Sequence, residues 1–265
     1  MKEQILRYLS PAYPWKEHLH FFPTIGSTND HIRALAKAGA PHGTAVIADH
    51  QTGGHGRSGR HFHSPGGVGV YLSILLRPRC SPTELMHLTC ATAVSMCDAV
   101  ESSAGFRPGI KWTNDLVSGN RKLGGILTEL GFTPQGKLDY AIIGIGINVR
   151  QNEADFPEEI REMAGSLAMI TGRDIDRSRV AARMLEELQR MDTRLLSEKA
   201  PILAQYKVDC ITLHRDVVLV RGNEKRYGHA IDLDEEGALI VRFADGRTEA
   251  VNSGEISVRG MYGYV

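Results

Sequence analysis

A glycine- and arginine-rich segment has residue types that suit the binding of an anion. Residues 51–60 read QTGGHGRSGR. Closely spaced glycines let the backbone approach a ligand and expose N–H groups as donors, and Arg57 and Arg60 add charge that suits phosphate or carboxylate. The segment lacks both the G-K-[S/T] ending of a Walker loop and a clear Rossmann fingerprint. Composition alone therefore leaves a flexible surface loop as an open alternative.

Polar side chains and glycines also recur in later segments. Residues 111–115 read KWTND and residues 122–129 read KLGGILTE, with the turn sequence SGNR between them at 118–121. That turn predicts a hairpin flanked by lysine, asparagine and aspartate side chains, and the paired glycines would let a ligand lie against bare backbone. Residues 144–149, GIGINV, read as a buried strand with a polar end. Solvated hairpin lysines and a plain core strand are the open alternatives.

The elements that must position these segments follow from hydrophobic spacing and turn residues. A helix is expected to begin at Ser27, where Asp30 three residues later predicts a capping box. Residues 1–22 show only short mixed patterns, and residues 51–63 form a loop of unusual length, which indicates a functional or a disordered segment. Strands are expected at 44–48, 68–76, 110–112, 123–130 and 140–149, and helices at 85–100 and within 158–207.

The composition changes near residue 213. The C-terminal stretch holds short β-prone runs separated by tight turns, which is typical of a small β-barrel. We therefore expect two domains, residues 1–212 and residues 213–265. In the second domain, strands are expected at 217–220, 227–233, 238–243 and 256–258.

Charge, cysteines and hydropathy limit the class of protein. The chain has 31 Lys+Arg and 31 Asp+Glu, a balance that argues against a general polyanion binder. Its four cysteines form no C-x-x-C pair and read as core thiols of a reducing compartment. Without a signal peptide or a run of 18 apolar residues, we expect a cytoplasmic protein that contacts no membrane.

A cluster of five histidines between residues 42 and 63 raises the question of a metal site. Glycine-rich spacing organises ligands poorly. We therefore assign no metal-ligating residue.

In order and spacing, the motifs together resemble those of biotin–protein ligases. Ser27-Thr28-Asn29 precedes the glycine–arginine segment, and K-W-x-N-D, K-x-x-G-I-L and G-I-G-I-N follow it. The likeness covers residues 22–150, and the C-terminal stretch resembles the SH3-like domain of the family. The resemblance implies an α+β fold: a mixed sheet like that of class II aminoacyl-tRNA synthetases, flanked by helices, with a small C-terminal SH3-like β-barrel.

The resemblance also implies roles for individual residues. Arg57 would hold the phosphate of an adenylate, Asn114 and Asn148 would meet its adenine, and Asp115 would sit beside the incoming amine. The biotin site would be lined by Ser27, Thr28, Gln51, Gly54, Lys122 and Gly125. The ligand-binding set further includes Asn29, His55, Gly56, Arg60, Lys111, Trp112 and Gly124. The expected catalytic residues are Arg57, Lys122 and Asp115.

Three residues depart from the family pattern. His55 stands where the family usually has Arg or Lys, so its contact with phosphate would be weaker or pH-dependent. Phe62 replaces a usual Trp and would keep an apolar anchor for the loop. Thr113 replaces a usual Pro, which leaves the path of its strand less constrained.

The implied activity joins biotin to a lysine through an adenylate. Biotin is the substrate, ATP and Mg²⁺ are required, and the acceptor is a biotin carboxyl carrier protein or a biotin-accepting domain of a carboxylase. Such a reaction needs no enzyme nucleophile, in agreement with the lack of a convincing Ser-His-Asp or Cys-His arrangement. A long loop that orders over the adenylate would exclude water from it.

Three other functions stay open at this stage. A lipoate–protein ligase of the same superfamily is the nearest, although the glycine–arginine loop with K-W-x-N-D favours biotin. A DNA-binding repressor is disfavoured because about 22 residues, not basic, precede the first motif, too few for a winged helix domain, and we expect no DNA binding. A non-catalytic binding module is the third. The sequence leaves undecided the oligomeric state, a homodimer included, and the identity of the carrier proteins.

Overall fold

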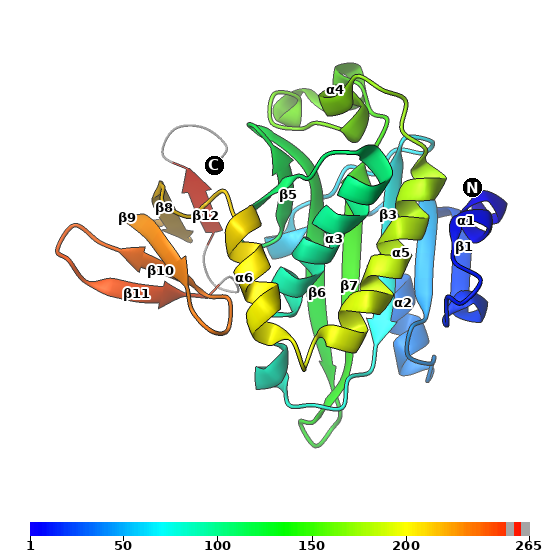
Figure 1. The fold of residues 1–265 in the computed structure, drawn as a ribbon, viewed down its shortest axis with the longest axis horizontal. Coiled ribbons are helices and arrows are strands. Elements are labelled where there is room, and N and C mark those ends of the chain that lie inside the picture. The colour runs from blue at the N-terminus through cyan, green and yellow to red at the C-terminus, as the bar shows by residue number, and fades with distance from the viewer. Residues whose placement is uncertain (253–256, 261–265) are drawn as a thin grey trace.

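Seven strands form the larger of two sheets in the computed structural model (Figure 1). The structure describes residues 1–252 and 257–260, the side chains of Ser58 and of 257–260 excepted. The strand order is β1-β2-β3-β7-β6-β5-β4, with β1 parallel to β2 and every other pair of neighbours antiparallel. The strands are β1 (Leu19–Ile25), β2 (Ala45–Gln51), β3 (Gly69–Leu76), β4 (Gly109–Lys111), β5 (Asp115–Ser118), β6 (Arg121–Phe132) and β7 (Leu138–Asn148).

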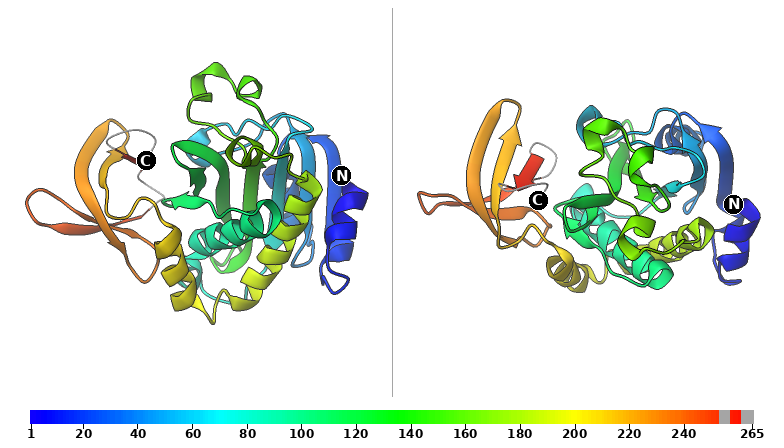
Figure 2. Two further views of the ribbon diagram at one scale, coloured as in Figure 1. Left: turned by 45° about the horizontal axis from the view of Figure 1, so that its top comes forward. Right: turned by 90° about the horizontal axis from the view of Figure 1, so that it is seen from above.

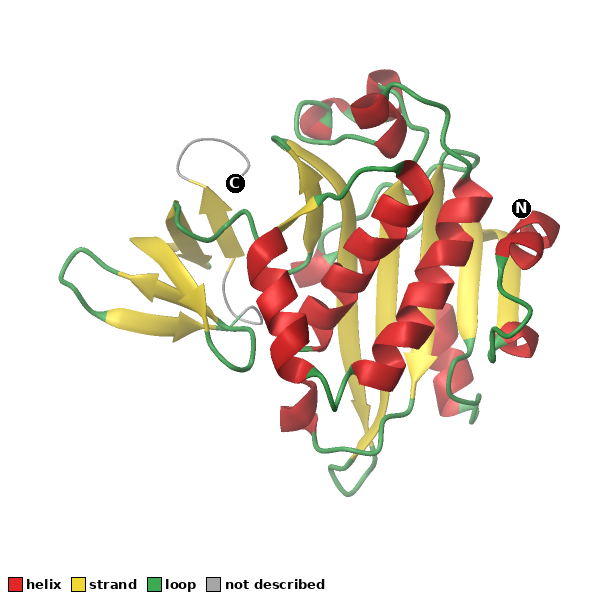
Figure 3. Ribbon diagram, in the orientation of Figure 1, coloured by secondary structure: helices red, strands yellow, loops and turns green. Residues whose placement is uncertain are grey.

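Helices cover both faces of this sheet. Figures 1 and 3 show α3, α5 and α6 side by side on one face, while α2 packs against β2, β3 and β7 from the other. The helices are α1 (Lys2–Tyr8), α2 (Thr28–Lys37), α3 (Leu88–Ala104), α4 (Leu167–Thr171), α5 (Arg177–Arg194) and α6 (Lys199–Asp209). Within the part of the chain that the structure describes, none of these helices is long and apolar enough to cross a bilayer.

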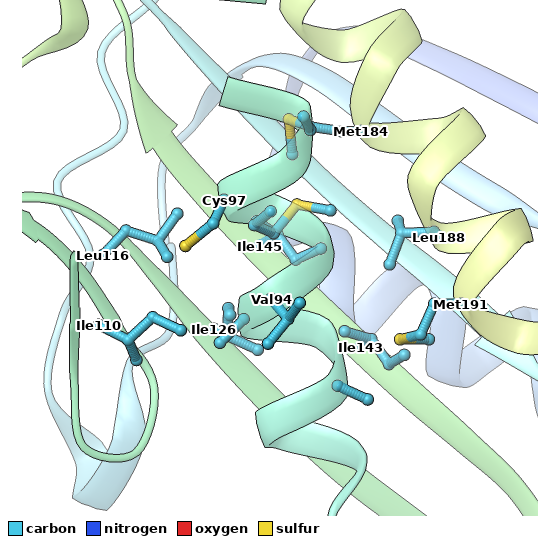
Figure 4. Close-up of a cluster of buried hydrophobic side chains, with 14 of the residues drawn as sticks. Val94, Cys97, Ile110, Leu116, Ile126, Ile143, Ile145, Met184, Leu188 and Met191 are labelled. Carbon is cyan, nitrogen blue, oxygen red and sulfur yellow. The ribbon is translucent and has the colours of Figure 1, made fainter. Parts of the chain in front are cut away.

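The main core lies between the sheet and helices α3 and α5. In α5 the apolar residues recur every three or four positions, so they form one stripe that faces the sheet; Val180, Met184, Leu188, Met191 and Leu195 are all buried. Figure 4 shows part of this stripe beside Ile143 and Ile145 of β7. A separate apolar cluster under α2, which includes Ile32 and Tyr140, covers the other face.

Two consecutive hairpins bring the polar motifs onto neighbouring strands. Gly119 adopts a positive φ of 54° in the β5–β6 turn, a conformation that glycine tolerates without steric cost. The pairing places Asp115 opposite Gly125 on β6, and Gly125 in turn opposite Gly146 on β7. Asp115 on β5 and the glycine-bearing segments of β6 and β7 therefore lie side by side.

The second sheet is antiparallel, in the order β11-β10-β9-β8-β12. Figure 2 shows it beside the α6 end of the larger sheet. The Trp112 indole N–H donates to the Gly237 carbonyl at 3.0 Å, and Lys199 pairs with Glu236 at 2.6 Å, so the KWTND motif and α6 both contact it. The strands are β8 (Asp216–Arg221), β9 (Glu224–Leu233), β10 (Leu239–Arg242), β11 (Thr248–Val251) and β12 (Ser257–Gly260).

The expected fold class is confirmed: helices flank a large mixed sheet, and a small antiparallel sheet follows. The hairpin across 118–121 and the free cysteine thiols are also as expected. The domain division at residue 213 stays a prediction. Part of the strand expected at 256–258 lies outside the described residues.

One local expectation is wrong, and one strand was not predicted. Residues 1–22, for which short mixed patterns were expected, contain the short helix α1 and most of β1, an edge strand that pairs with β2. The capping box at Ser27 does not form, since its side chain makes no cap hydrogen bond. Asp30 is engaged instead by Arg33 and His55, and these contacts outcompete the backbone.

Asp176 caps α5 and ties it to α1. Its carboxylate accepts from the Ser178 amide at 2.8 Å and from the Tyr8 hydroxyl at 2.7 Å. We expect Asp176→Ala to lower the free energy of unfolding by about 1 kcal/mol at pH 7. Burial raises the pKa of Asp176, but the hydrogen bonds outweigh it and lower the pKa on balance.

The sign of the pH dependence follows from that lowered pKa. The contribution of Asp176 is complete above the unfolded Asp pKa of about 3.9 and is lost as the pH falls through the lower folded value. Urea unfolding of wild type and variant at pH 7 and below pH 4 should therefore give a difference that shrinks in acid. An equal difference at both pH values would contradict the role of the carboxylate charge.

Candidate small-molecule site under the glycine–arginine loop

A small pocket lies where the start of α2, the loop after β2, the β5–β6 hairpin and β7 meet. Because the β5–β6 and β6–β7 hairpins are adjacent, side chains from distant motifs converge here. The pocket is lined by Ser27, Thr28, Asn29, Gln51, His55, Gly56, Arg57, Phe62, Asn114, Lys122, Gly125, Ile126, Leu127, Gly144, Ile145 and Gly146.

The glycine–arginine loop folds over this pocket. Its tip is closed by hydrogen bonds from the Gly56 amide to the Arg60 carbonyl and from the Phe62 amide to the Gly54 carbonyl. The Phe62 ring lies so close to Gly146 that a Cβ on that glycine would be 2.3 Å from a ring carbon. Phe62 therefore acts as the apolar anchor expected from the sequence, and glycine on β7 makes room for it.

Buried hydrogen bonds form one wall of the pocket. The Thr28 amide and hydroxyl both donate to Gln51 Oε1, at 2.8 and 2.9 Å, and Gln51 Nε2 donates to the Ser64 hydroxyl at 3.0 Å. Behind Thr28, the Ser73 hydroxyl lies 2.8 Å from the Thr28 hydroxyl and 2.5 Å from Asn29 Oδ1. Ser73 is fully buried, so no bulk water reaches it.

A proton count shows that this wall is one donor short. The Thr28 amide fixes Gln51 Oε1 as the acceptor, and the Glu129 carboxylate, which can only accept, fixes Asn29 with Nδ2 toward it and Oδ1 toward Ser73. Three oxygen–oxygen contacts then join Gln51, Thr28, Ser73 and Asn29, but only two hydroxyl protons are present. The Thr28 hydroxyl oxygen then accepts no hydrogen bond from Ser73, and a ligand N–H placed against Thr28 would donate to it.

Charged groups form the opposite side of the site. Lys122 Nζ lies 2.6 Å from Asp115 Oδ1, and the Asn114 amide donates to the same oxygen at 3.2 Å. Arg57 donates from the loop to Asn114 Oδ1 at 2.8 Å and to the Thr113 hydroxyl at 3.0 Å. Lys122 and Asp115 are 30% and 17% exposed, so their attraction is only partly screened by solvent.

Burial lowers the pKa of the Arg57 guanidinium, and the nearby Asp115 carboxylate opposes this effect. Arginine nonetheless stays protonated in proteins. The loop therefore places a permanent positive charge beside Lys122. Two cations at one end of a small pocket suit a carboxylate or a phosphate.

His55 is paired within the protein. Its Nε2 lies 2.7 Å from Asp30 Oδ2, and Asp30 also binds Arg33 at 2.6 Å. Burial raises the pKa of Asp30, but these two partners lower it on balance. The expected phosphate contact of His55 would have to compete with Asp30.

The structure brings together part of the predicted site. Ten of the predicted residues line the pocket: Ser27, Thr28, Asn29, Gln51, His55, Gly56, Arg57, Asn114, Lys122 and Gly125. Seven do not: Gly54, Arg60, Lys111, Trp112, Asp115, Gly124 and Asn148. Asp115 touches the site through Lys122, whereas the Asn148 amide is hydrogen-bonded at both ends, to Gly165 and Gln151. The adenine contact of Asn148 stays a prediction.

Several lining residues were absent from the predicted site, among them Gly144 and Gly146. Glycine at every second position places both on one face of a strand, because strand side chains alternate. That face is thus bare backbone, and the alternation in GIGI was the sequence signal for it. A Cβ on Gly144 would lie 2.0 Å from Asn29 Oδ1.

We expect Gly144→Ala to displace the Asn29 side chain and to reduce ligand affinity at least about tenfold, the effect of losing one charge-assisted or buried hydrogen bond. Gly66→Ala is the matched control, because its Cβ would meet only ordinary contacts at 3.4 Å or more. Isothermal calorimetry on both variants checks this. Equal affinities would mean that the Asn29 position is not critical.

Among the described residues, no group of three His, Cys, Asp or Glu side chains is placed to hold a metal ion.

Fold and site together define a class: a two-sheet α/β protein with a small-molecule pocket, closed by an arginine-bearing loop and bordered by paired cationic and acidic side chains. Comparisons with known families agree with this class. The sequence model of the Biotin/lipoate A/B protein ligase family matches residues 21–148, and that of the Biotin protein ligase C terminal domain matches residues 212–259.

Individual proteins are similar over nearly the whole chain. The bifunctional ligase/repressor BirA of Bacillus spizizenii is 34% identical over 93% of this chain and 76% of its own length. The biotin–[acetyl-CoA-carboxylase] ligase of Mycobacterium tuberculosis is 31% identical over 91% of this chain and 89% of its own length. A structure of the Aquifex aeolicus biotin protein ligase with biotin and ATP is 31% identical, with a TM-score of 0.77. The match covers 91% of this chain and 98% of that one. The chain belongs to the Biotin/lipoate A/B protein ligase family, among the biotin protein ligases.

Proposed function

We propose that this protein activates biotin with ATP to biotinyl-5′-AMP and transfers the biotinyl group to a lysine of an acceptor protein. One observation carries the choice of ligand: the pocket lacks a donor at Thr28 and is cationic at Lys122 and Arg57. Biotin offers ureido N–H groups at one end and a carboxylate at the other. The ureido end would lie against Thr28 and Gln51, and the carboxylate against Lys122.

The missing hydrogen-bond donor at Thr28 also makes the site discriminate between biotin and lipoate. The dithiolane ring of lipoate carries no N–H group and would leave the Thr28 hydroxyl oxygen without a donor. An unsatisfied buried polar contact costs about 1–3 kcal/mol. The site should therefore favour biotin over lipoate by about a factor of ten or more.

In the first step, a biotin carboxylate oxygen attacks the α-phosphate of ATP, and pyrophosphate leaves. Lys122 would orient the carboxylate, and Arg57 would stabilise the charge that develops on the phosphate. Arg57 is preorganised for this by its bonds to Thr113 and Asn114. Closure of the loop would keep water from the mixed anhydride.

In the second step, the neutral acceptor amine attacks the biotinyl carbonyl, AMP leaves, and the amine loses a proton. With an ordinary lysine pKa near 10.4, about one amine in 2,500 is neutral at pH 7, a deficit of roughly 4.6 kcal/mol. We propose that Asp115 orients this amine and accepts its proton. Because Asp115 is paired with Lys122 at 2.6 Å, Lys122 would have to shift toward the ligand first.

Magnesium would enter with ATP. Mg²⁺ usually keeps several waters and binds through one or two carboxylates plus substrate phosphates. Bound in this way, it would spread the negative charge of the phosphates.

The test is direct. The protein is incubated with ATP, Mg²⁺, a biotin carboxyl carrier domain and either biotin or lipoate, and the carrier is weighed. We expect the mass of one biotinyl group, with pyrophosphate release that depends on biotin. Modification by lipoate at equal efficiency, or release of pyrophosphate with neither, would contradict the proposal.

We propose that the acceptor is a biotin carboxyl carrier protein or a biotin-accepting domain of a carboxylase. We also propose that this chain does not bind operator DNA. Footprinting at nanomolar protein and physiological salt tests the second. Sedimentation velocity with and without biotin would decide whether the protein forms a homodimer.

A further inference from the structure

Glu129 lies on β6 behind the pocket wall and is not one of the residues that line the pocket. Arg33 of α2 donates to both of its carboxylate oxygens, at 2.7 and 2.8 Å. Asn29 Nδ2 donates to one of the same oxygens at 2.8 Å. Among the hydrogen bonds of the described residues, Glu129 reaches the wall through Asn29.

This contact determines which way the Asn29 amide points. A carboxylate only accepts hydrogen bonds, and both Glu129 oxygens accept from Arg33. Asn29 must therefore turn its NH₂ toward Glu129 and its oxygen toward Ser73. The side chain is 4% exposed and lies across the bare backbone of Gly144, so it has little room to adopt another rotamer.

We propose that Glu129 is a positioning residue for ligand selection. By fixing Asn29, it forces the Ser73 hydroxyl to donate to Asn29, and this leaves the Thr28 hydroxyl oxygen without a donor from Ser73. The pocket then selects a ligand that donates a hydrogen bond at Thr28. This inference rests on the proposed function, since it takes the ureido N–H of biotin as that donor.

The variant Glu129→Gln is expected to allow the reversed orientation of the Asn29 amide. In Glu129→Gln, the new amide can donate to Asn29 Oδ1, so Asn29 can turn over. Asn29 Nδ2 then donates to Ser73, Ser73 to Thr28, and Thr28 to Gln51, and every contact has its proton. The wall no longer needs a donor from the ligand.

The experiment compares three ligands by calorimetry. Biotin has both ureido N–H groups; cyclic carbamate analogues have one N–H replaced by oxygen; desthiobiotin keeps both N–H groups but lacks sulfur. We expect the wild type to bind biotin about tenfold or more tightly than at least one carbamate. In Glu129→Gln that ratio should fall toward one, while the ratio of desthiobiotin to biotin stays as in the wild type.

Companion variants separate positioning from structure. Glu129→Asp keeps an acceptor and should keep the carbamate ratio, whereas Glu129→Met removes the acceptor and should lower it, which gives a second route if the Gln variant does not fold. Glu101→Gln, which also removes a carboxylate paired with arginine but lies on α3, should change nothing.

Two results would overturn the proposal: an unchanged carbamate ratio in both Glu129→Gln and Glu129→Met, or a parallel change of the carbamate and desthiobiotin ratios, which would indicate general loosening. Failure of the proposed function is visible separately. In that case the wild type itself would bind no biotin, and the inference would fall with it.

Discussion

Lys122→Ala is expected to bind biotin roughly ten- to hundredfold more weakly than the wild type and to form biotinyl-AMP correspondingly more slowly. A charge-assisted hydrogen bond to a carboxylate contributes about 1.5–3 kcal/mol, and each 1.4 kcal/mol is a factor of ten in affinity. Calorimetry with biotin, followed by pyrophosphate release in single turnover, measures both effects. Unchanged affinity together with normal adenylate formation would refute the role of Lys122.

The same substitution is also expected to lower stability, because Asp115 is 17% exposed and loses a partner at 2.6 Å. The double variant Lys122→Ala/Asp115→Asn separates the two effects. Removing the charge of Asp115 should restore part of the free energy of unfolding, whereas biotin affinity should stay low. Recovery of affinity in the double variant would mean that Lys122 acts only by neutralising Asp115.

Arg57→Gly is expected to release the adenylate roughly ten- to a hundredfold faster than the wild type. Arg57 would hold the phosphate from a loop that its own bonds to Thr113 and Asn114 keep closed, and the lost contacts are worth about 1.5–3 kcal/mol. Free biotinyl-AMP acylates exposed neutral amines. Proteins other than the acceptor should therefore become biotinylated in proportion to their accessible lysines.

A mixture of carrier domain and serum albumin measures this loss of retention. Arg57→Lys keeps the charge but not the paired geometry and should give an intermediate off-rate. Arg79→Gly removes an exposed arginine that does not line the pocket and should leave albumin unlabelled. Unlabelled albumin and an unchanged off-rate in Arg57→Gly would show that Arg57 does not clamp the adenylate.

Loop closure connects these expectations. The Phe62 ring packs on Gly146, and the tip of the loop is held by backbone hydrogen bonds. Arg57 reaches across to the β4–β5 turn, which α6 supports through a hydrogen bond from Tyr206 to the Thr113 carbonyl. The position of the arginine charge therefore depends on packing that originates outside the loop.

Local patterns in the sequence determined much of this protein. The hairpin across 118–121, the helix that begins after Ser27 and the apolar stripe of α5 were predictable, because turn residues and side-chain periodicity act over a few positions. The ordered motifs also indicated most of the residues that line the pocket. A sequence pattern predicts such features because the interactions that produce them act between residues a few positions apart.

The tertiary structure alone decided which of these residues touch. Asn29 and Glu129 are 100 positions apart, and only the packing of α2 across the sheet joins them. The strand β1 is formed through parallel pairing with β2, which no local pattern indicated. Likewise, Asp30 pairs with His55 and Arg33 rather than capping its helix, since a side chain goes to the strongest partners that folding brings within reach. Hydrogen-bond direction, and with it the missing donor at Thr28, depends on such long-range contacts and not on the motif that contains the residue.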